Sequence, residues 1–264
     1  MLGIIGCGNM GASIAKGVIK AGKKASGLII YDKDEKKLRQ VSGKYRIPVS
    51  KSLEELISKS GIILIAVKPQ DILQVLETIK KLHKRQLVIS IAAGIPASFI
   101  EKIIGGKVRV VRVMPNLAAK VSRSVSALSK GRFADKFDLK EAERIFSKIG
   151  YCLNVDEKAI DSITAVSGSG PGYFYYFMSC MQKAAVKLGF NEKTAKLLIL
   201  HTAQGAVNLL SEKDDFSNLA DKVASKGGTT RAALSSFQKD GFCKIVERAL
   251  KKAKLRAGEL SKLS

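Results

Sequence analysis

The sequence contains few of the residues that build metal sites and disulfide frameworks. Its 264 residues include only four cysteines and two histidines. The cysteines form no C-x-x-C pair, and His83 and His201 have no spacing that would complete a zinc site with them. We therefore expect no bound metal, and we interpret the cysteines as ordinary buried or surface thiols.

Long hydrophobic runs are also missing. The longest apolar stretches, such as residues 62–67, are far shorter than the ~18–20 residues that span a bilayer. No basic leader precedes the first apolar residues, so the N-terminus does not predict a signal peptide. Because 46% of the residues are hydrophobic and 26% are charged, the composition is that of a globular protein rather than a disordered one. We expect a cytoplasmic protein with no membrane partner.

Acidic residues are scarce beside basic ones, with 23 Asp and Glu against 46 Lys and Arg and a net charge of +23. An excess of this size can indicate a nucleic-acid partner. The lysines, however, occur singly or in pairs along the whole chain, without a block of five basic residues or interleaved aromatics. We therefore expect no specific nucleic-acid binding, although the charge should attract anionic substrates at low salt.

The first half alternates short apolar runs with amphipathic stretches. The runs are rich in β-branched residues and lack polar alternation, as in parallel strands that are buried on both faces. Strands are predicted over residues 2–5, 27–31, 62–67, 87–91, 108–114 and 151–155. Helices are predicted over 9–21, over 34–42 with a stop at Gly43, from Ser52, over 69–81, and from Asp138 to Gly150. This order predicts an α/β fold with a doubly wound sheet.

After residue 155 the strand signal ends and the pattern becomes helical. Helices are predicted over 159–188, from Asn191 to residue 210, over 217–225, and in two segments after Thr230 that Asp240-Gly241 separates. We predict a sheet domain over residues 1–155 and an all-α domain over residues 156–264. Long helices with so much apolar surface often pack against a second subunit, so we expect a homodimer formed through the second domain.

A glycine-rich loop follows the first strand. Residues 6–11 read Gly-Cys-Gly-Asn-Met-Gly and fit the G-x-G-x-x-G pattern between a strand and a helix. Gly6 permits the tight turn, Gly8 lets the backbone approach a pyrophosphate, and Gly11 allows close helix–strand packing. The N–H groups at the start of the helix favour phosphate. This segment predicts a dinucleotide-binding site.

The end of the second strand bears on which dinucleotide binds. Asp32 stands 21 positions after Gly11, where an acid commonly accepts hydrogen bonds from the adenosine ribose. An acid there favours NAD, whereas Lys33 beside it could bind the 2′-phosphate of NADP. The sequence therefore leaves NADH and NADPH both open. A flavin also fits the loop, but no second feature indicates a flavin ring.

A second glycine cluster, Ser225-Lys226-Gly227-Gly228-Thr229-Thr230-Arg231, precedes a predicted helix. Glycine N–H groups and a helix N-terminus both favour negative charge. We interpret the cluster as a site for a small carboxylate, held by the N–H groups of Gly228, Thr229 and Thr230. A plain interhelical turn is the alternative.

These motifs together resemble those of the pyrroline-5-carboxylate reductases along nearly the whole chain. The matching segments are 6–11 (GCGNMG), 66–70 (AVKPQ), 90–95 (SIAAGI), 114–116 (MPN), 164–171 (TAVSGSGP) and 225–231 (SKGGTTR). Many dehydrogenases share the first motif, whereas the last two, in this order and spacing, are highly specific to the family.

The resemblance implies a Rossmann-type N-terminal domain, an all-α dimerisation domain, and dimers that assemble further, for example into a decamer. It implies reduction of 1-pyrroline-5-carboxylate to L-proline by NADPH or NADH. With Asp32 and Lys33, the expected cofactor-binding residues are Gly6, Gly8, Asn9, Met10, Gly11, Ala66, Val67, Lys68, Pro69, Ala92, Ala93 and Gly94. The expected substrate-binding residues are Ser225, Gly227, Gly228, Thr229, Thr230 and Glu157, and Thr230 would hydrogen-bond the ring nitrogen. Because a protonated imine is already an electrophile, the reaction needs orientation rather than a strong general acid.

Two positions depart from the family pattern. Lys226 stands where the family usually has proline, which loosens the turn and adds a cation beside the anion site. Leu117 and Ala118 replace the usual Thr-Pro after Met-Pro-Asn. These departures leave two alternatives open, a reductase for a related cyclic imino acid and a catalytically weak nucleotide-binding paralogue.

Overall fold

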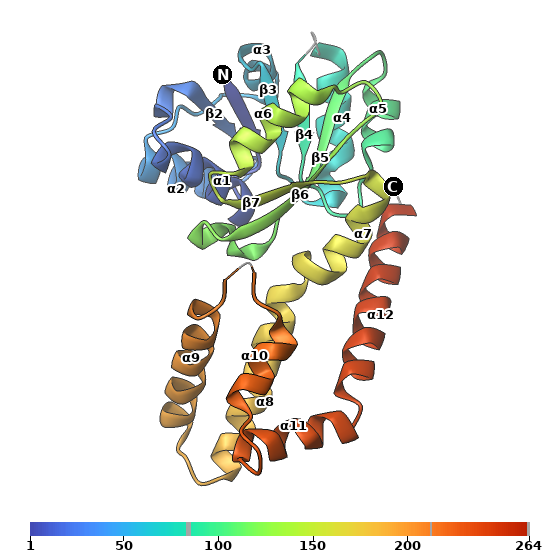
Figure 1. Cartoon of the computed structure of the whole chain (residues 1–264). Coiled ribbons are helices and arrows are strands. Elements are labelled where there is room, and N and C mark those ends of the chain that lie inside the picture. Colours follow the sequence, from blue (N-terminus) through green and yellow to red (C-terminus); the bar gives the residue numbers. More distant parts are fainter. Residues whose placement is uncertain (83–85, 212, 263–264) are drawn as a thin grey trace. The chain divides into compact units, whose positions relative to one another are not determined.

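The computed structural model describes residues 1–82, 86–211 and 213–262 (Figure 1). The chain divides into two compact units, Met1–Pro171 with Ala253–Ser264, and Gly172–Lys252. The predicted domain boundary after residue 155 lies earlier in the chain than this division and stays a prediction. His83 lies outside the described residues. No described helix is long and apolar enough to cross a membrane.

The first unit is built on a β-sheet. Its strands are β1 Leu2–Ile5, β2 Leu28–Tyr31, β3 Ile62–Ile65, β4 Leu87–Ser90, β5 Arg109–Met114, β6 Ser124–Lys130 and β7 Gly150–Asn154. Among the described residues these seven strands lie in the order β2-β1-β3-β4-β5-β6-β7, and every neighbouring pair except β5 and β6 is parallel. Because β1 has β2 on one side and β3 on the other, the predicted doubly wound sheet is confirmed.

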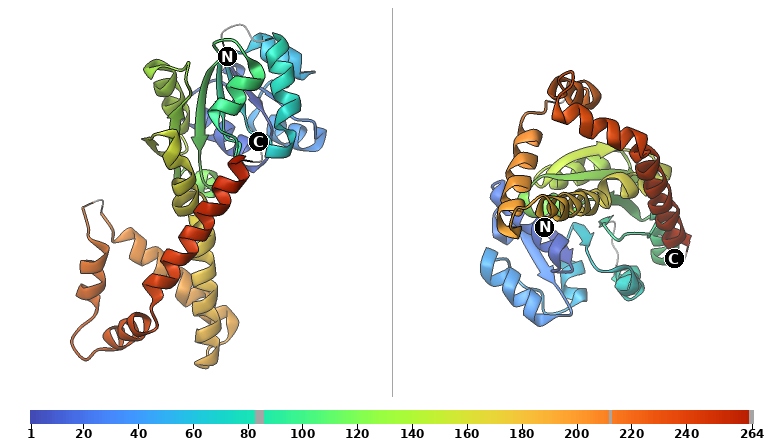
Figure 2. Two further views of the ribbon diagram at one scale, coloured as in Figure 1. Left: turned by 90° about the vertical axis from the view of Figure 1, so that its right-hand side faces the viewer. Right: turned by 90° about the horizontal axis from the view of Figure 1, so that it is seen from below.

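Helices cover both faces of this sheet (Figure 2). They are α1 Asn9–Lys20, α2 Glu35–Tyr45, α3 Leu53–Lys59, α4 Ile72–Leu82, α5 Ala97–Ile104, α6 Lys136–Phe146 and α7 Ile160–Ile163. Successive side chains of a strand point to opposite faces, so Leu2 and Ile4 pack in one apolar cluster with Phe146 of α6. Ile5 packs in the other cluster, with Leu56 of α3. Burial on both faces explains why these strands have continuous apolar sequences.

Two elements of this unit are not predicted by the sequence pattern. The segment of β6 contains Ser124, Ser126 and Ser129, which are buried and interrupt its apolar run. α5 follows Pro96, which has no side-chain oxygen to cap the helix, so no local start signal is present.

Three predicted helix ends are wrong, one of them the C-terminal end of α6, which lies at Phe146 rather than at Gly150. α6 is capped by Asp135 rather than Asp138, since the Asp135 carboxylate accepts the N–H groups of Phe137 at 2.7 Å and Asp138 at 3.0 Å. α2 does not stop at Gly43 but continues to Tyr45 and ends where Arg46 adopts a left-handed conformation, with φ of 54°. A left-handed residue ends a helix whether or not it is glycine.

The second unit is helical. Its helices are α8 Gly170–Lys187, whose first two residues belong to the first unit, α9 Glu192–Asn208, α10 Phe216–Val223, α11 Thr229–Lys239, and the first part of α12 Phe242–Lys262. The predicted single helix over residues 159–188 is wrong, because a π-helical turn, Thr164–Gly168, separates α7 from α8. The predicted cap of α9 is confirmed, since Asn191 Oδ1 accepts the N–H of Thr194 at 2.8 Å.

Large apolar side chains are exposed along the helices of the second unit. Tyr176 on α8 is 74% exposed, Leu209 after α9 is 82% exposed, and Phe216 on α10 is 73% exposed. Exposed large apolar side chains in this number are typical of helices that form a protein–protein interface.

Candidate functional site

The predicted cofactor residues of the first unit gather at one edge of the sheet. Strands β1 to β4 are parallel, so their carboxyl ends meet at this edge. Residues 6–11 follow β1, Asp32 follows β2, residues 66–69 follow β3, and residues 92–94 follow β4. Open α/β sheets bind their ligands at this edge, beside the strand where the chain order reverses, which here is β1.

The three glycines of residues 6–11 have different roles. Gly6 has φ of +104°, and a Cβ there would lie 2.6 Å from the carbonyl oxygen of Ala66, so only glycine fits. A Cβ on Gly11 would overlap the carbonyl oxygen of Gly6. Gly8 differs, because its φ is −67° and a Cβ there would meet nothing within 4 Å. Gly8 is also the N-cap of α1 without a side-chain hydrogen bond, so the helix N-terminus faces open space that suits a phosphate.

A basic cavity adjoins Gly8. Its volume is about 590 Å³, and Gly8 and Asn9 contribute to its wall. The charged residues that line it are all lysines, namely Lys16, Lys37, Lys44, Lys68 and Lys120. Positive charge beside an uncapped helix N-terminus fits the pyrophosphate and phosphate groups of a nicotinamide dinucleotide.

Asp32 holds the glycine loop in place. Its Oδ2 accepts the N–H of Cys7 at 2.6 Å, and its Oδ1 accepts the N–H of Asp34 at 2.8 Å. The neighbouring Lys33 pairs with Asp71 at 2.5 Å while its side chain stays 71% exposed. Burial and the negative charge of Asp32 together raise the pKa of the Cys7 thiol to about 12, so this thiol is protonated at neutral pH.

Two motifs that lie far apart in the sequence meet in the first unit. Asn116 Nδ2 donates to the carbonyl oxygen and to Oγ of Ser167, both at 3.2 Å. A Cβ on Gly168 would lie 2.9 Å from Cε of Met114. Ala118 donates its N–H to Asn116 Oδ1 at 3.2 Å, so the turn after Met-Pro-Asn closes without the Thr-Pro that is usual there.

The second glycine cluster starts α11, as predicted. Gly228 is the N-cap, and no described side chain caps the helix. The Gly228 N–H donates to the carbonyl oxygen of Ser225 at 3.0 Å within the turn, and the expected role of Gly228, Thr229 and Thr230 in holding a carboxylate stays a prediction. Arg231 fixes the turn by pairing with Asp221 at 2.9 Å.

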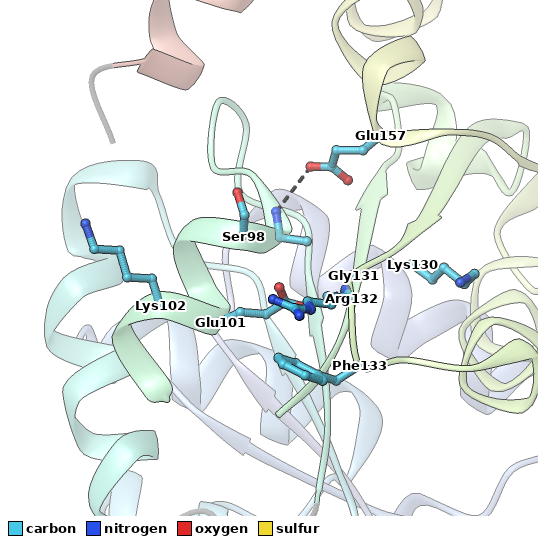
Figure 3. Close-up of a pocket in the computed structure, with 9 residues that line it drawn as sticks. Ser98, Glu101, Lys102, Lys130, Gly131, Arg132, Phe133 and Glu157 are labelled. Atoms are coloured by element: carbon cyan, nitrogen blue, oxygen red, sulfur yellow. Dashed lines mark hydrogen bonds between the residues drawn. The ribbon is translucent and has the colours of Figure 1, made fainter. Parts of the chain in front are cut away.

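Glu157 lies in the first unit, whereas Ser225, Gly227, Gly228, Thr229 and Thr230 lie in the second. Its Oε1 accepts from Arg112 Nη1 at 2.9 Å and from the N–H of Ala97 at 3.1 Å. Its Oε2 is buried without a partner among the described residues. Glu157 also borders a cavity of about 500 Å³ beside the start of α5 (Figure 3).

Arg112 is the residue of this region that sequence reasoning missed. Its side chain is only 5% exposed although it stands in the strand β5. The available signal was the second arginine of the run Arg-Val-Val-Arg-Val-Met, which lies between apolar residues of a predicted buried strand and therefore requires a buried acidic partner. Across the described residues, no group of three or more His, Cys, Asp or Glu side chains is placed to hold a metal ion.

Two family models match the chain. "Pyrroline-5-carboxylate reductase dimerisation" matches residues 157–260, and "NADP oxidoreductase coenzyme F420-dependent" matches residues 1–94. The chain is 37% identical to the pyrroline-5-carboxylate reductase of Pseudomonas aeruginosa over 263 residues, which cover 98% of this chain and 96% of the relative.

Solved structures agree with these matches. A pyrroline-5-carboxylate reductase from Coxiella burnetii superposes with a TM-score of 0.93 at 32% identity, covering 98% of each chain. Pyrroline carboxylate reductase from Plasmodium falciparum, solved with NADP bound, superposes with a TM-score of 0.86 at 31% identity, covering 98% of this chain and 97% of that one. The predicted Rossmann-type sheet followed by a helical dimerisation domain is confirmed.

Proposed function

The chain belongs to the pyrroline-5-carboxylate reductase family, and on this premise we propose that it transfers a hydride from NADPH or NADH to the C=N bond of 1-pyrroline-5-carboxylate, giving L-proline. The observation that carries the proposal is the 37% identity over 98% of the chain. The reaction assigns the protein to proline biosynthesis.

We propose that the loops at the carboxyl edge of β1 to β4 hold the dinucleotide. The open space at Gly8, the uncapped start of α1 and the lysine-lined cavity support this assignment. When bound, the cofactor supplies the hydride. The residues that would contact it are Gly6, Gly8, Asn9, Met10, Gly11, Asp32, Lys33, Ala66, Val67, Lys68, Pro69, Ala92, Ala93 and Gly94.

We propose that the start of α11 binds the imino acid. Thr229 and Thr230 would donate their N–H groups to the carboxylate, and the Thr230 hydroxyl would hydrogen-bond the ring nitrogen and orient the C=N bond. Ser225, Gly227 and Gly228 would shape the turn that presents these groups. The hydrogen bond within the turn and the Arg231–Asp221 pair support a fixed geometry even though Lys226 replaces proline.

We propose that the protein is a homodimer through its helical unit and that dimers assemble further, for example into a decamer. The family model for dimerisation over residues 157–260 and the exposed apolar side chains of α8 to α10 support the dimer. We also propose a cytoplasmic location, which fits the free cysteines, and no specific nucleic-acid or membrane partner, which fits the dispersed lysines.

A kinetic assay tests the function. Purified protein with 1-pyrroline-5-carboxylate should oxidise NADPH or NADH, as followed by the absorbance of the reduced nicotinamide, and should form one proline per cofactor oxidised. A protein that binds either cofactor but forms no proline would overturn the proposal.

A further inference from the structure

Arg112 is a buried cation that joins two distant parts of the first unit. Its Nη1 donates to Glu157 Oε1 at 2.9 Å, and its Nη2 lies 4.0 Å from Asp161 Oδ1. The Arg112 side chain is 5% exposed, whereas those of Glu157 and Asp161 are 34% and 30% exposed. A buried charge needs such partners, so this arginine fixes both carboxylates against the sheet.

Glu157 in turn holds the start of α5. The oxygen that pairs with Arg112 also accepts the N–H of Ala97 at 3.1 Å, which Figure 3 marks with a dashed line. Ala97 is the first residue of α5, and the N-cap Pro96 offers no side-chain oxygen. A carboxylate at this position satisfies a backbone donor that has no partner within the helix and lies at the positive end of its dipole. Residues 92–95, which contain the proposed nicotinamide contacts, end directly before this anchor.

The end of α12 contacts the same loop from another element. Gly94 has φ of +74°, and a Cβ there would lie 3.0 Å from Cβ and 3.1 Å from the carbonyl carbon of Leu260. Ser261 Oγ donates to Asp161 Oδ1 at 3.4 Å. Leu260 and Ser261 belong to the segment of α12 that is part of the first unit. The loop therefore lies between an anchor at Ala97 and a close backbone contact at Gly94. The anchor is connected to Arg112 through Glu157. The segment that contacts Gly94 is connected to Arg112 through Ser261 and Asp161.

We propose that Arg112, Glu157 and Asp161 form a positioning cluster that, with the last turns of α12, fixes residues 92–97 for the nicotinamide end of the cofactor. Glu157 thus acts on the cofactor loop rather than as a ligand of the imino acid. This inference rests on the proposed function for the identity of the ligand that the loop contacts. The geometry of the anchor is independent of that function.

Three variants and a matched control test the cluster. Glu157→Ala removes the acceptor for the Ala97 N–H, Glu157→Gln keeps a neutral acceptor, and Asp161→Asn weakens the link from Arg112 to Ser261. The control Glu247→Gln removes a surface ion pair with Lys251 on the part of α12 that lies in the second unit, and the side chains of Glu247 and Lys251 are 61% and 72% exposed. Such exposed pairs contribute little, so the control should match the wild type.

The first measurement is amide hydrogen exchange over residues 92–97 without cofactor. The second is the NADPH dissociation constant, measured by calorimetry without substrate. In Glu157→Ala we expect faster exchange at Ala97 and about tenfold weaker NADPH binding, because a charge-assisted hydrogen bond is lost. Glu157→Gln should restore most of the protection, and Asp161→Asn should show a smaller loss of affinity. If Glu157→Ala does not fold, the NADPH affinity of Asp161→Asn compared with that of Glu247→Gln decides, because only the former should be weakened.

Two results would overturn the proposal. One is unchanged exchange and unchanged NADPH affinity in both Glu157 variants. The other is a raised KM for the imino acid alone, which would make Glu157 a substrate ligand. If the wild type binds neither NADPH nor NADH, the proposed function fails, whereas the exchange data still decide whether Glu157 anchors the loop.

Discussion

The carboxylate of Asp32 offers a quantitative test of how the glycine loop is held. Its two oxygens accept the N–H groups of Cys7 at 2.6 Å and Asp34 at 2.8 Å. Hydrogen bonds to a charged group contribute about 1.5–3 kcal/mol each. Asp32→Asn keeps one acceptor oxygen, and because the residue is half-buried we expect the lower value, a loss of about 1.5 kcal/mol. Asp32→Ala removes both bonds and should lose about 3 kcal/mol.

These losses can be read from thermal unfolding and cofactor binding together. For a chain of this size, about 1.5 kcal/mol corresponds to a decrease in Tm of about 3–6 °C. The NADH dissociation constant should rise about tenfold in Asp32→Asn, since the weakened hydrogen bond to the Cys7 N–H no longer orients the loop. Asp240→Asn, at an exposed carboxylate after α11, is the control and should change neither quantity. An Asp32→Asn protein with the Tm and NADH affinity of the wild type would refute the reasoning.

Four further outcomes follow from the site. Gly8→Ala should leave Tm unchanged but weaken NADPH binding at least tenfold, because its Cβ enters only the space that a pyrophosphate would occupy. Gly6→Ala should lower Tm markedly, since its Cβ meets the Ala66 backbone at a positive φ; equal Tm values for the two variants would contradict both assignments. Thr230→Ala should lower kcat/KM about 10–100-fold without a change in Tm, and steady-state kinetics that match the wild type would remove Thr230 from the mechanism. Cys7 should resist alkylation of the native protein at pH 8, because its pKa is raised to about 12 and the reactive thiolate forms only as the pH approaches that value; mass spectrometry that finds Cys7 modified would contradict its burial.

The sheet and its binding edge could be predicted from the sequence because parallel strands leave a strong local signal. The runs at β1 and β3 are apolar on both faces, and the glycine spacing after β1 has a direct steric cause at Gly6 and Gly11. β6 could not be predicted, since buried serines such as Ser126 take the place of the β-branched residues that mark the other strands. α5 starts without a local cap because its acceptor, Glu157, lies 60 positions away.

For the candidate site, the sequence predicts residues but not the partners that hold them in place. Sequence spacing placed Asp32 at the end of β2, but nothing in the spacing shows that both of its oxygens accept loop N–H groups. Arg112 was missed because an arginine within a strand does not reveal its partners, which follow 45 and 49 positions later in the chain. Contacts between segments that far apart depend on tertiary packing rather than on local pattern.

The most direct test of the account is proline formation measured against cofactor oxidation by the wild-type protein and by Thr230→Ala. The account predicts one proline for each NADPH or NADH oxidised by the wild type, with both rates reduced by the same factor in the variant. Cofactor oxidation without proline, or proline formation that does not depend on Thr230, would contradict it.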